Sequence, residues 1–146
     1  MRYELDVEAI IEADPAALWR AWTDTARFPD WDPREEQNRL DGPFAAGTSG
    51  WSKQRGAPGG PYTLATINPQ QNWQVESPLP GGMLTVDHRM HVLDDGKVRV
   101  SKQYVASGPM SLAFRLYFGR KIRQSMPDSF AALAAEAARL AAEAQA

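Results

Sequence analysis

The chain has 146 residues, of which 43% are hydrophobic and 23% are charged, and it carries a formal net charge of −2. This length and balance suit one globular domain with its own core, so we expect a single domain over residues 1–146. The absence of cysteine excludes a disulfide framework, a thiolate nucleophile and a thiolate-ligated metal.

Charge is distributed unevenly along the chain. Residues 1–41 contain 11 acidic and 5 basic side chains, whereas residues 97–123 contain 7 basic and no acidic ones. The overall balance argues against a general nucleic-acid binder, which is usually basic, but leaves a local basic surface open. The charged N-terminus lacks the apolar segment of a secretory signal, and no apolar run of about 20 residues is present. We therefore expect a cytoplasmic protein.

The first elements are a strand and two short helices. Apolar and charged residues alternate over residues 3–11, which predicts a strand with one buried face. An Asp-Pro pair is then typical of a helix N-cap and first turn, so a short helix is expected over residues 16–23. Residues 28–33 predict a second short helical turn with Phe28 and Trp31 as its apolar anchors.

Six further strands follow, and glycine, proline or asparagine bounds most of them. The clearest turn is Asp-Asp-Gly at residues 94–96, which is typical of a tight hairpin. The short connections predict mostly antiparallel pairing. These strands are expected over residues 34–41, 48–54, 62–68, 73–77, 83–93 and 97–106.

The chain ends in a long helix, predicted over residues 110–145, that Pro127 should kink or break. Beyond Pro127, apolar residues recur three and four apart, as in a helix that packs closely on another layer. A sheet of about seven strands curls, and only this helix is long enough to fill its concave face. We therefore predict an α+β fold in which a curved antiparallel sheet surrounds the C-terminal helix.

Three turn motifs accompany this element order: Phe28-Pro29-x-Trp31-x-Pro33, Leu40-Asp41-Gly42-Pro43-Phe44 and Gly47-Thr48-x-Gly50. With them, the chain resembles the polyketide cyclase/dehydrase branch of the START-like superfamily, which also contains the birch-pollen allergen family. The resemblance implies a helix-grip fold with a deep cavity between sheet and helix. Members bind lipids, sterols, polyketides or other apolar molecules, and some catalyse cyclisation or dehydration. They share no universal catalytic motif, so none is carried over, and neither a cofactor nor a metal is expected.

His88 is the most informative polar residue. The strand over residues 83–93 places His88 on one face with the apolar Val86 and Met90. There it could hydrogen-bond a ligand or act as a general acid or base, or it could be a core histidine satisfied by a neighbour. His91 lies three positions further along the strand and so on the opposite face, which argues against a metal site.

Lys102 and Tyr104 share the apolar face of the last predicted strand. Lys102 could line the pocket and pair with a carboxylate, but a bulge or a side chain that reaches back to solvent is the favoured interpretation. Glu36 shares a face with Asn38. If this face points inward, Glu36 is the natural partner of Lys102 or His88; a solvated edge strand is the alternative.

The first part of the terminal helix is rich in large apolar side chains. Phe114, Phe118, Ile122 and Met126 recur every four residues, and they could form a pocket wall or simply pack in the core. Basic residues between positions 115 and 123 could attract anionic headgroups or an anionic ligand, or could form a solvated face.

Three functions remain open. The first is the binding of a hydrophobic or amphipathic small molecule of lipid, polyketide or aromatic type. The second is a cyclase or dehydratase that uses His88 as acid or base, with Glu36 and Tyr104 as further proton-transfer candidates. The third is an adaptor that contacts a membrane surface or a protein through the basic helix segment. The predicted pocket residues are Trp31, Glu36, Asn38, Val86, His88, Met90, Lys102, Tyr104, Phe114, Phe118, Ile122 and Met126.

Overall fold

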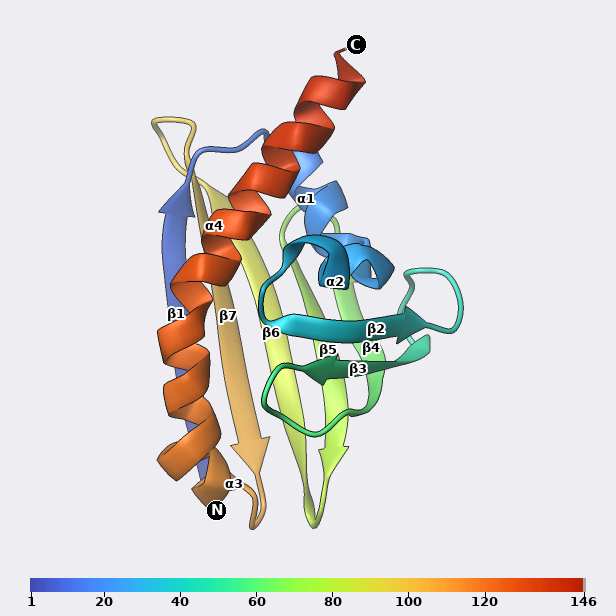
Figure 1. The fold of residues 1–146 in the computed structure, drawn as a ribbon, viewed down its shortest axis with the longest axis vertical. Helices are drawn as coiled ribbons and strands as arrows, with labels where there is room; N and C mark the ends of the chain where they lie inside the picture. Colours follow the sequence, from blue (N-terminus) through green and yellow to red (C-terminus); the bar gives the residue numbers. More distant parts are fainter. Residues whose placement is uncertain (146) are drawn as a thin grey trace.

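A seven-stranded antiparallel sheet and a long C-terminal helix make up most of the fold, and the computed structural model describes residues 1–145. Figure 1 shows the helix crossing the face of the sheet, with two short helices beside its second half. The predicted α+β helix-grip architecture is therefore confirmed. The strands are β1 (Arg2–Ile11), β2 (Glu35–Leu40), β3 (Ser49–Gln54), β4 (Gly60–Asn68), β5 (Asn72–Leu79), β6 (Gly82–Val92) and β7 (Val98–Ser107).

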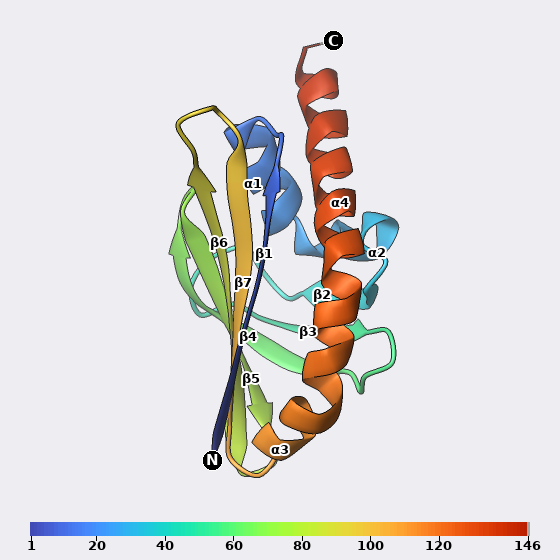
Figure 2. The same ribbon diagram turned by 90° about the vertical axis from the view of Figure 1, so that its left-hand side faces the viewer.

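The order of strands in the sheet is β1-β7-β6-β5-β4-β3-β2. Strands β2 to β7 therefore follow each other in sequence, while β1 joins β7 at one edge and β2 forms the other. Figure 2 shows that β2 and β3 curve toward the side on which the terminal helix lies. The curl gives the sheet a concave face, which the helix covers only in part.

The segment between β1 and β2 packs on one end of this concave face. Helix α1 (Pro15–Thr23) begins as predicted, because the Asp14 side chain accepts a hydrogen bond from the Ala17 amide at 2.9 Å. Its buried face carries Leu18 and Trp22, which belong to the main core. The 3₁₀ turn η1 (Thr25–Arg27) and the short helix α2 (Phe28–Trp31) then lead into β2.

The terminal helix is irregular at a different place from the one predicted. Helix α4 (Gly119–Ala144) runs through Pro127 without a break, so the expected break there is wrong. Proline removes one backbone hydrogen bond, and the burial of Met126 and Phe130 against the sheet offsets this loss. The irregular geometry precedes α4, where α3 (Ser111–Ala113) leads into the π-helical turn η2 (Phe114–Phe118). Among residues 1–145, no helix has the length and apolarity needed to cross a bilayer.

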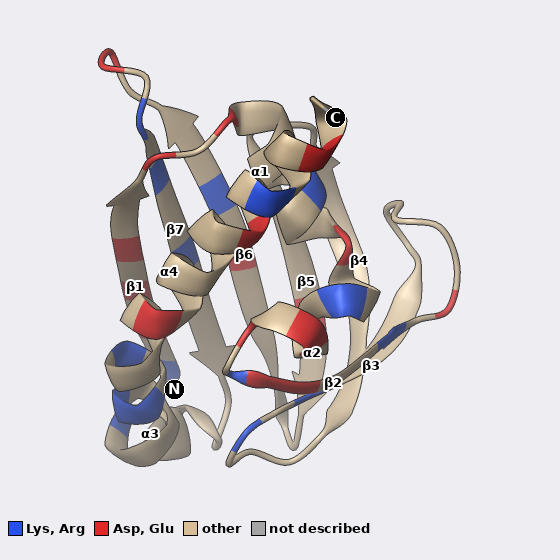
Figure 3. Cartoon of the chain, turned by 45° about the horizontal axis from the view of Figure 1, so that its top comes forward, with Lys and Arg blue, Asp and Glu red and all other residues tan. Residues whose placement is uncertain are grey.

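Lys and Arg residues gather at the start of α4, next to α3, as Figure 3 shows. The acidic residues of β1 lie on a different part of the molecule, where Glu8 pairs with Arg99 at 3.4 Å. The uneven charge along the sequence is thus also uneven in space.

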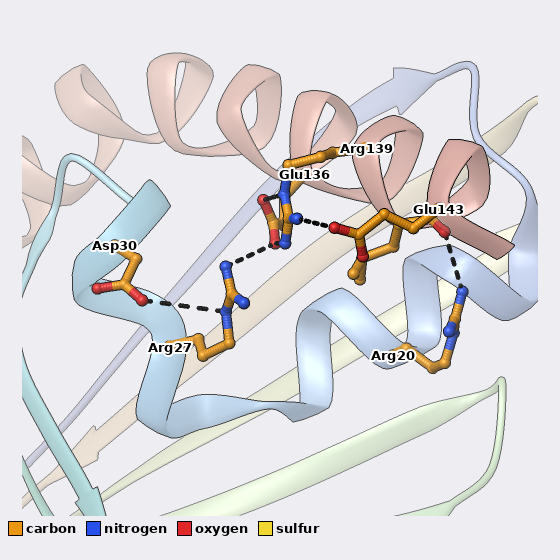
Figure 4. Close-up of polar contacts among 7 residues, drawn as sticks. Arg20, Arg27, Asp30, Glu136, Arg139 and Glu143 are labelled. Carbon is orange, nitrogen blue, oxygen red and sulfur yellow. Dashed lines mark hydrogen bonds and ion pairs between the residues drawn. The ribbon is translucent and has the colours of Figure 1, made fainter. Parts of the chain in front are cut away.

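The second half of α4 is fastened to α1 and η1 by the polar contacts in Figure 4. Glu136 is almost fully buried, and it accepts hydrogen bonds from Arg27 at 3.4 Å and from Arg139 Nε at 2.9 Å. Arg20 donates to the Leu140 carbonyl oxygen at 3.4 Å. The hydrogen bonds from Arg139 hold the pKa of the Glu136 carboxyl below its usual value. These contacts fix where α4 lies on the sheet.

Candidate functional site

A cavity of about 450 Å³ lies between the concave face of the sheet and the start of α4. Strands β2 to β7 all contribute to its wall, and η2 with the first turn of α4 covers the remaining side. Most of the wall is apolar, so the cavity favours a ligand with a large hydrophobic part. The large apolar lining residues are Phe28, Trp73, Val75, Leu79, Leu84, Val86, Met110, Phe114, Phe118 and Ile122.

Exposure of the lining residues changes from one end of the cavity to the other. The exposed part of the lining consists of most of residues 55–59 in the β3–β4 loop, Pro78 near the end of β5, Pro80 in the β5–β6 turn, and Lys121. His88 and Val86 of β6 and Lys102 and Tyr104 of β7 are buried. Solvent therefore reaches the cavity from the end that is lined by the β3–β4 loop, the β5–β6 turn and η2 with the first turn of α4.

A β-bulge in β2 decides which glutamate faces the cavity. The pairing of β2 with β3 shifts register between Glu35 and Gln37. Glu35 and Asn38 therefore both line the cavity, whereas Glu36 is exposed and pairs with Lys53. The prediction that Glu36 shares a face with Asn38 is wrong, because the bulge inserts one residue and reverses the alternation. Of the two positions considered for Glu36, the solvated one is found.

Glu35 is held by a chain of amide and hydroxyl groups. Its side chain accepts hydrogen bonds from Asn38 Nδ2 at 3.2 Å and from Gln54 Nε2 at 3.1 Å. The Tyr62 hydroxyl donates to Asn38 Oδ1 at 2.8 Å and so fixes the orientation of that amide. Burial raises the pKa of Glu35, although the Gln54 hydrogen bond and the charge of Lys102 act against the shift. The carboxyl is thus ordered, and it holds a proton more tightly than an exposed glutamate.

His88 is 6% exposed and lies between two tryptophans. Its ring stacks on Trp73 with the centroids 3.6 Å apart, and the Trp22 ring meets it edge-on at 5.6 Å. His88 Nδ1 lies 3.1 Å from the Trp73 carbonyl oxygen, so the neutral ring carries its proton there as a donor. Burial lowers the pKa of His88 well below its usual value, and the charge of Lys102 lowers it further. Such an imidazole is neutral at pH 7 and a weak base.

Lys102 lies in the cavity wall and is only 8% exposed. It sits opposite Val7 on β1 and opposite His88 on β6, in a register without interruption. The favoured expectation of a bulge that turns Lys102 outward is therefore wrong, because both neighbouring strands hold it on the concave face. The charge of Lys102 acts on Glu35 through space, and no hydrogen bond or salt bridge joins its ammonium to another side chain among residues 1–145.

A second cationic group lies where β2 begins. Arg34 Nε donates to Ser125 Oγ on α4 at 2.8 Å, and Arg34 Nη1 donates to the Tyr104 hydroxyl on β7 at 3.4 Å. Arg34 and Tyr104 both line the cavity. Through these two hydrogen bonds, Arg34 at the start of β2 links α4 to β7 beside the cavity.

The cavity carries an excess of positive charge. Its lining includes four cationic side chains and one carboxyl group, that of Glu35. No group of three or more potential metal-ligating side chains is found in the part of the chain that the structure describes. The arrangement can accept the anionic or strongly polarised oxygen of an otherwise apolar molecule. The cationic lining residues are Arg34, Arg55, Lys102 and Lys121.

The structure brings eight of the twelve predicted pocket residues into the cavity wall: Asn38, Val86, His88, Lys102, Tyr104, Phe114, Phe118 and Ile122. The other four lie elsewhere. Glu36 is on the surface, and Trp31 packs edge-on against Phe28 outside the lining. Met90 and Met126 are buried in the core instead, because the helix there packs directly on the sheet and leaves no space.

Several lining residues were missed by the sequence reasoning. Trp73, Val75 and Leu79 alternate along β5, and this period of two was a signal that could have identified them. The glycine- and proline-rich segment at residues 55–61 was interpreted as a turn only, but it forms part of the wall. Glu35 had no such signal, since a bulge follows from packing between strands rather than from a local pattern.

No protein-family model matches the chain, and no curated protein matches it. Solved structures do match. The Zhui aromatase/cyclase from Streptomyces sp. R1128 has a TM-score of 0.74 at 12% identity, over 95% of both chains. Ara h 8.0201 has a TM-score of 0.70 at 13% identity, over 95% of this chain and 99% of its own.

A norcoclaurine synthase from Thalictrum flavum, a point mutant in complex with a transition-state analogue, has a TM-score of 0.67 at 10% identity. The match covers 91% of this chain and 95% of that chain. At such identities the likeness establishes the fold alone. The resemblance that the turn motifs indicated is confirmed at that level.

Proposed function

We propose that the chain acts as one helix-grip domain that binds an amphipathic small molecule in its cavity, with the apolar body against the aromatic wall and an acidic group toward Lys102. The observation that carries the proposal is Lys102, an 8% exposed residue of the cavity wall whose ammonium has no hydrogen-bonding side chain among residues 1–145. The ammonium is open to the cavity, so a ligand anion at this place would form a charge-assisted contact in largely apolar surroundings.

The size and composition of the cavity support this proposal. Its volume of about 450 Å³ lies within the range of about 300–1,000 Å³ that is usual for small-molecule sites. Phe114, Phe118 and Trp73 offer aromatic surface for a ring system or a folded chain. The fold is also that of the Zhui aromatase/cyclase and of norcoclaurine synthase, whose names indicate small-molecule chemistry.

A matched pair of fluorescent probes tests the proposal. Anilinonaphthalene sulfonate and phenylnaphthylamine share an apolar skeleton, but only the first carries a negative charge. We expect the folded chain to bind both and to prefer the sulfonate. Lys102→Met should weaken sulfonate binding about tenfold or more and leave the neutral probe unchanged, because a charge-assisted contact is lost.

The controls separate the cavity from the surface. Lys53→Met removes a half-buried lysine that lies outside the cavity lining and pairs with Glu36, and it should change neither affinity. Leu84→Trp, at a half-buried lining position, should exclude both probes. If the folded protein binds neither probe, or if Leu84→Trp leaves both affinities unchanged, the proposed binding function is wrong.

A second candidate function is acid–base catalysis on the bound molecule, and the raised pKa of the ordered Glu35 favours it. In this proposal the Glu35 carboxylate takes a proton from a carbon next to a carbonyl group. The C–H bond breaks, the proton goes to Glu35, and the electron pair moves to the carbonyl oxygen, which Lys102 stabilises as an enolate. Burial and the charge of Lys102 lower the pKa of His88 and so weaken it as a base, whereas burial raises the pKa of Glu35.

Deuterium exchange tests this second function without a known substrate. Aryl methyl ketones and 1,3-diketones in deuterated buffer should exchange their α-protons faster with the protein than without it. Glu35→Gln should abolish the acceleration, while Glu36→Gln should retain it. Equal rates with Glu35→Gln and the unmodified protein would remove Glu35 as the base.

A further inference from the structure

The segment at the start of the terminal helix exposes large apolar side chains. Leu112, Leu116 and Tyr117 are 47%, 64% and 50% exposed, although large apolar residues are usually buried. They lie within six positions of one another in α3 and η2, and none of them lines the cavity. Phe114 and Phe118, from the same turns, point to the other side and form part of the cavity wall.

Three arginines adjoin this apolar surface. Arg115, Arg120 and Arg123 surround a surface pocket of about 250 Å³, and Tyr3, Gly119 and Gln124 complete its lining. No acidic side chain lines this pocket, and none of the three arginines forms a salt bridge among residues 1–145. Figure 3 shows the cationic cluster on this end of α4.

The position of the arginine pocket is fixed by contacts with β1. Arg115 donates to the Arg2 carbonyl oxygen at 3.4 Å, and its guanidinium lies 5.7 Å from the centre of the Tyr3 ring. A Cβ atom at Gly119 would lie only 2.5 Å from the Tyr3 hydroxyl, so a glycine here permits the close approach of β1 and α4. Arg115 is therefore held in place by β1, and Arg120 and Arg123 extend from the exposed side of α4 beside it.

We propose that these residues form a docking face for the surface of an anionic phospholipid bilayer. The docking face consists of Leu112, Arg115, Leu116, Tyr117, Arg120 and Arg123. Guanidinium groups bind phosphate oxygens well, and adjacent leucine and tyrosine side chains enter the boundary between headgroups and acyl chains. The docking face flanks the solvent-facing end of the cavity, since η2 belongs to both.

Docking at this face brings the cavity entrance to the lipid surface. An amphipathic ligand could then pass between bilayer and cavity without crossing water. The inference about the membrane surface rests on the exposed side chains, not on the proposed ligand binding, so each can fail without the other.

Vesicle sedimentation with the full chain tests the electrostatic part. We expect binding to phosphatidylcholine vesicles that contain about 30% phosphatidylglycerol, and much weaker binding to phosphatidylcholine alone. Each arginine near an anionic surface contributes about fivefold in affinity, so Arg120→Glu with Arg123→Glu should weaken binding about 25-fold or more. The matched double variant Lys97→Glu with Arg99→Glu, at the distant β6–β7 turn and the start of β7, should bind like the unmodified chain.

Site-specific labelling tests the apolar part, and the chain suits it because it contains no cysteine. Leu116→Cys with an environment-sensitive nitrobenzoxadiazole label should shift its emission to the blue on anionic vesicles. The same label at Lys97→Cys should not shift. Binding of the anilinonaphthalene probes should persist in Arg120→Glu with Arg123→Glu, since neither arginine lines the cavity.

Three outcomes would overturn the proposal: equal binding to neutral and anionic vesicles, equal loss in both charge-reversal variants, or no vesicle binding at all. The last result, with the exposed side chains unexplained, would point to a protein partner on this face. Loss of vesicle binding with retained probe binding supports the docking face and leaves the cavity proposal intact.

Discussion

His88 and Lys102 lie directly opposite each other on β6 and β7, and both side chains are buried on the concave side of the sheet. Because burial and the neighbouring ammonium lower the pKa of His88, the folded chain resists a proton that the unfolded chain accepts near pH 6.5. The neutral His88 therefore contributes to the stability of the fold above about pH 6.5, and this contribution is lost as the pH falls toward the lowered pKa.

The first prediction follows from this sign. The free energy of unfolding should decrease below about pH 6.5, with a contribution from His88 of up to about 1.4 kcal/mol per pH unit. Urea unfolding between pH 7.5 and 5.5 measures the slope. His88→Gln should flatten it, whereas His91→Gln, at an exposed position on the same strand, serves as the matched control. Equal slopes for His88→Gln and the unmodified chain would contradict the assignment.

The second prediction concerns Lys102 itself. Lys102→Met should raise the pKa of His88, because it removes a nearby positive charge while burial remains. The stability at pH 7.5 should change by only about 1 kcal/mol or less, since an ammonium without a side-chain partner is replaced by an apolar side chain of similar size. An NMR titration of the His88 ring protons checks the shift. An unchanged titration would show that Lys102 does not act on the imidazole.

The third prediction separates the two adjacent glutamates of β2. The raised pKa of Glu35 gives a contribution to stability that is full below about pH 4.5 and is lost as the pH rises through the folded-state value. Glutamine does not titrate, so Glu35→Gln does not lose stability in this way. The free energy of unfolding of the variant, relative to that of the unmodified chain, should therefore rise from pH 4 to pH 7. Glu36→Gln breaks an exposed ion pair, which is screened by solvent, so it should leave stability nearly unchanged at every pH. A rise for both variants would argue against the bulge.

The fourth prediction uses two glycines of the curled edge. A Cβ atom at Gly50 would lie 2.3 Å from the Arg39 carbonyl oxygen and 2.7 Å from the Tyr62 ring, whereas one at Gly60 would meet nothing within 4 Å. Gly50→Ala should therefore destabilise the protein by about 1–3 kcal/mol, and Gly60→Ala should be nearly neutral. Thermal unfolding of both variants compares them. If the two changes cost the same, β2 and β3 do not approach as closely as described.

The fifth prediction tests how α4 is fastened. Glu136 contacts Arg27 and Arg139 from a nearly buried position, whereas Glu143 bonds to Arg139 at the exposed end of the helix. Glu136→Ala should lower stability by about 1–2 kcal/mol, and Glu143→Ala by about 0.5 kcal/mol or less. Denaturant unfolding at low and high salt measures both. A larger loss of stability with Glu143→Ala than with Glu136→Ala would contradict the conclusion that Glu136 holds α4 in place.

The strands and their antiparallel direction could be predicted from the sequence, because most of the strands have a repeat of two and a turn signal at their ends. The face that Val86 and His88 share on β6 followed from that repeat alone. The Asp14 cap likewise gave the start of α1. These features depend on residues that are close together in the sequence, so a local sequence pattern is enough to predict them.

The predictions were wrong where contacts between segments distant in sequence determine which way a side chain points or where the cavity ends. The bulge that exchanges Glu36 for Glu35 depends on how β2 pairs with β3. The direct packing of α4 on the sheet removes Met90 and Met126 from the cavity, and no pattern in either segment indicates where the space ends. Lys102 was expected to turn outward because it is charged, but two flanking strands fix its direction.

The pairing of β1 with β7 also has a consequence in time. More than half of the chain separates these strands, so the first strand to leave the ribosome has no partner until almost the last strand has followed it. Contacts between such distant segments slow folding, and the helix that covers the concave face is made later still. During synthesis the apolar side of β1 therefore stays uncovered longest, which makes it the part of the nascent chain that most needs protection from aggregation.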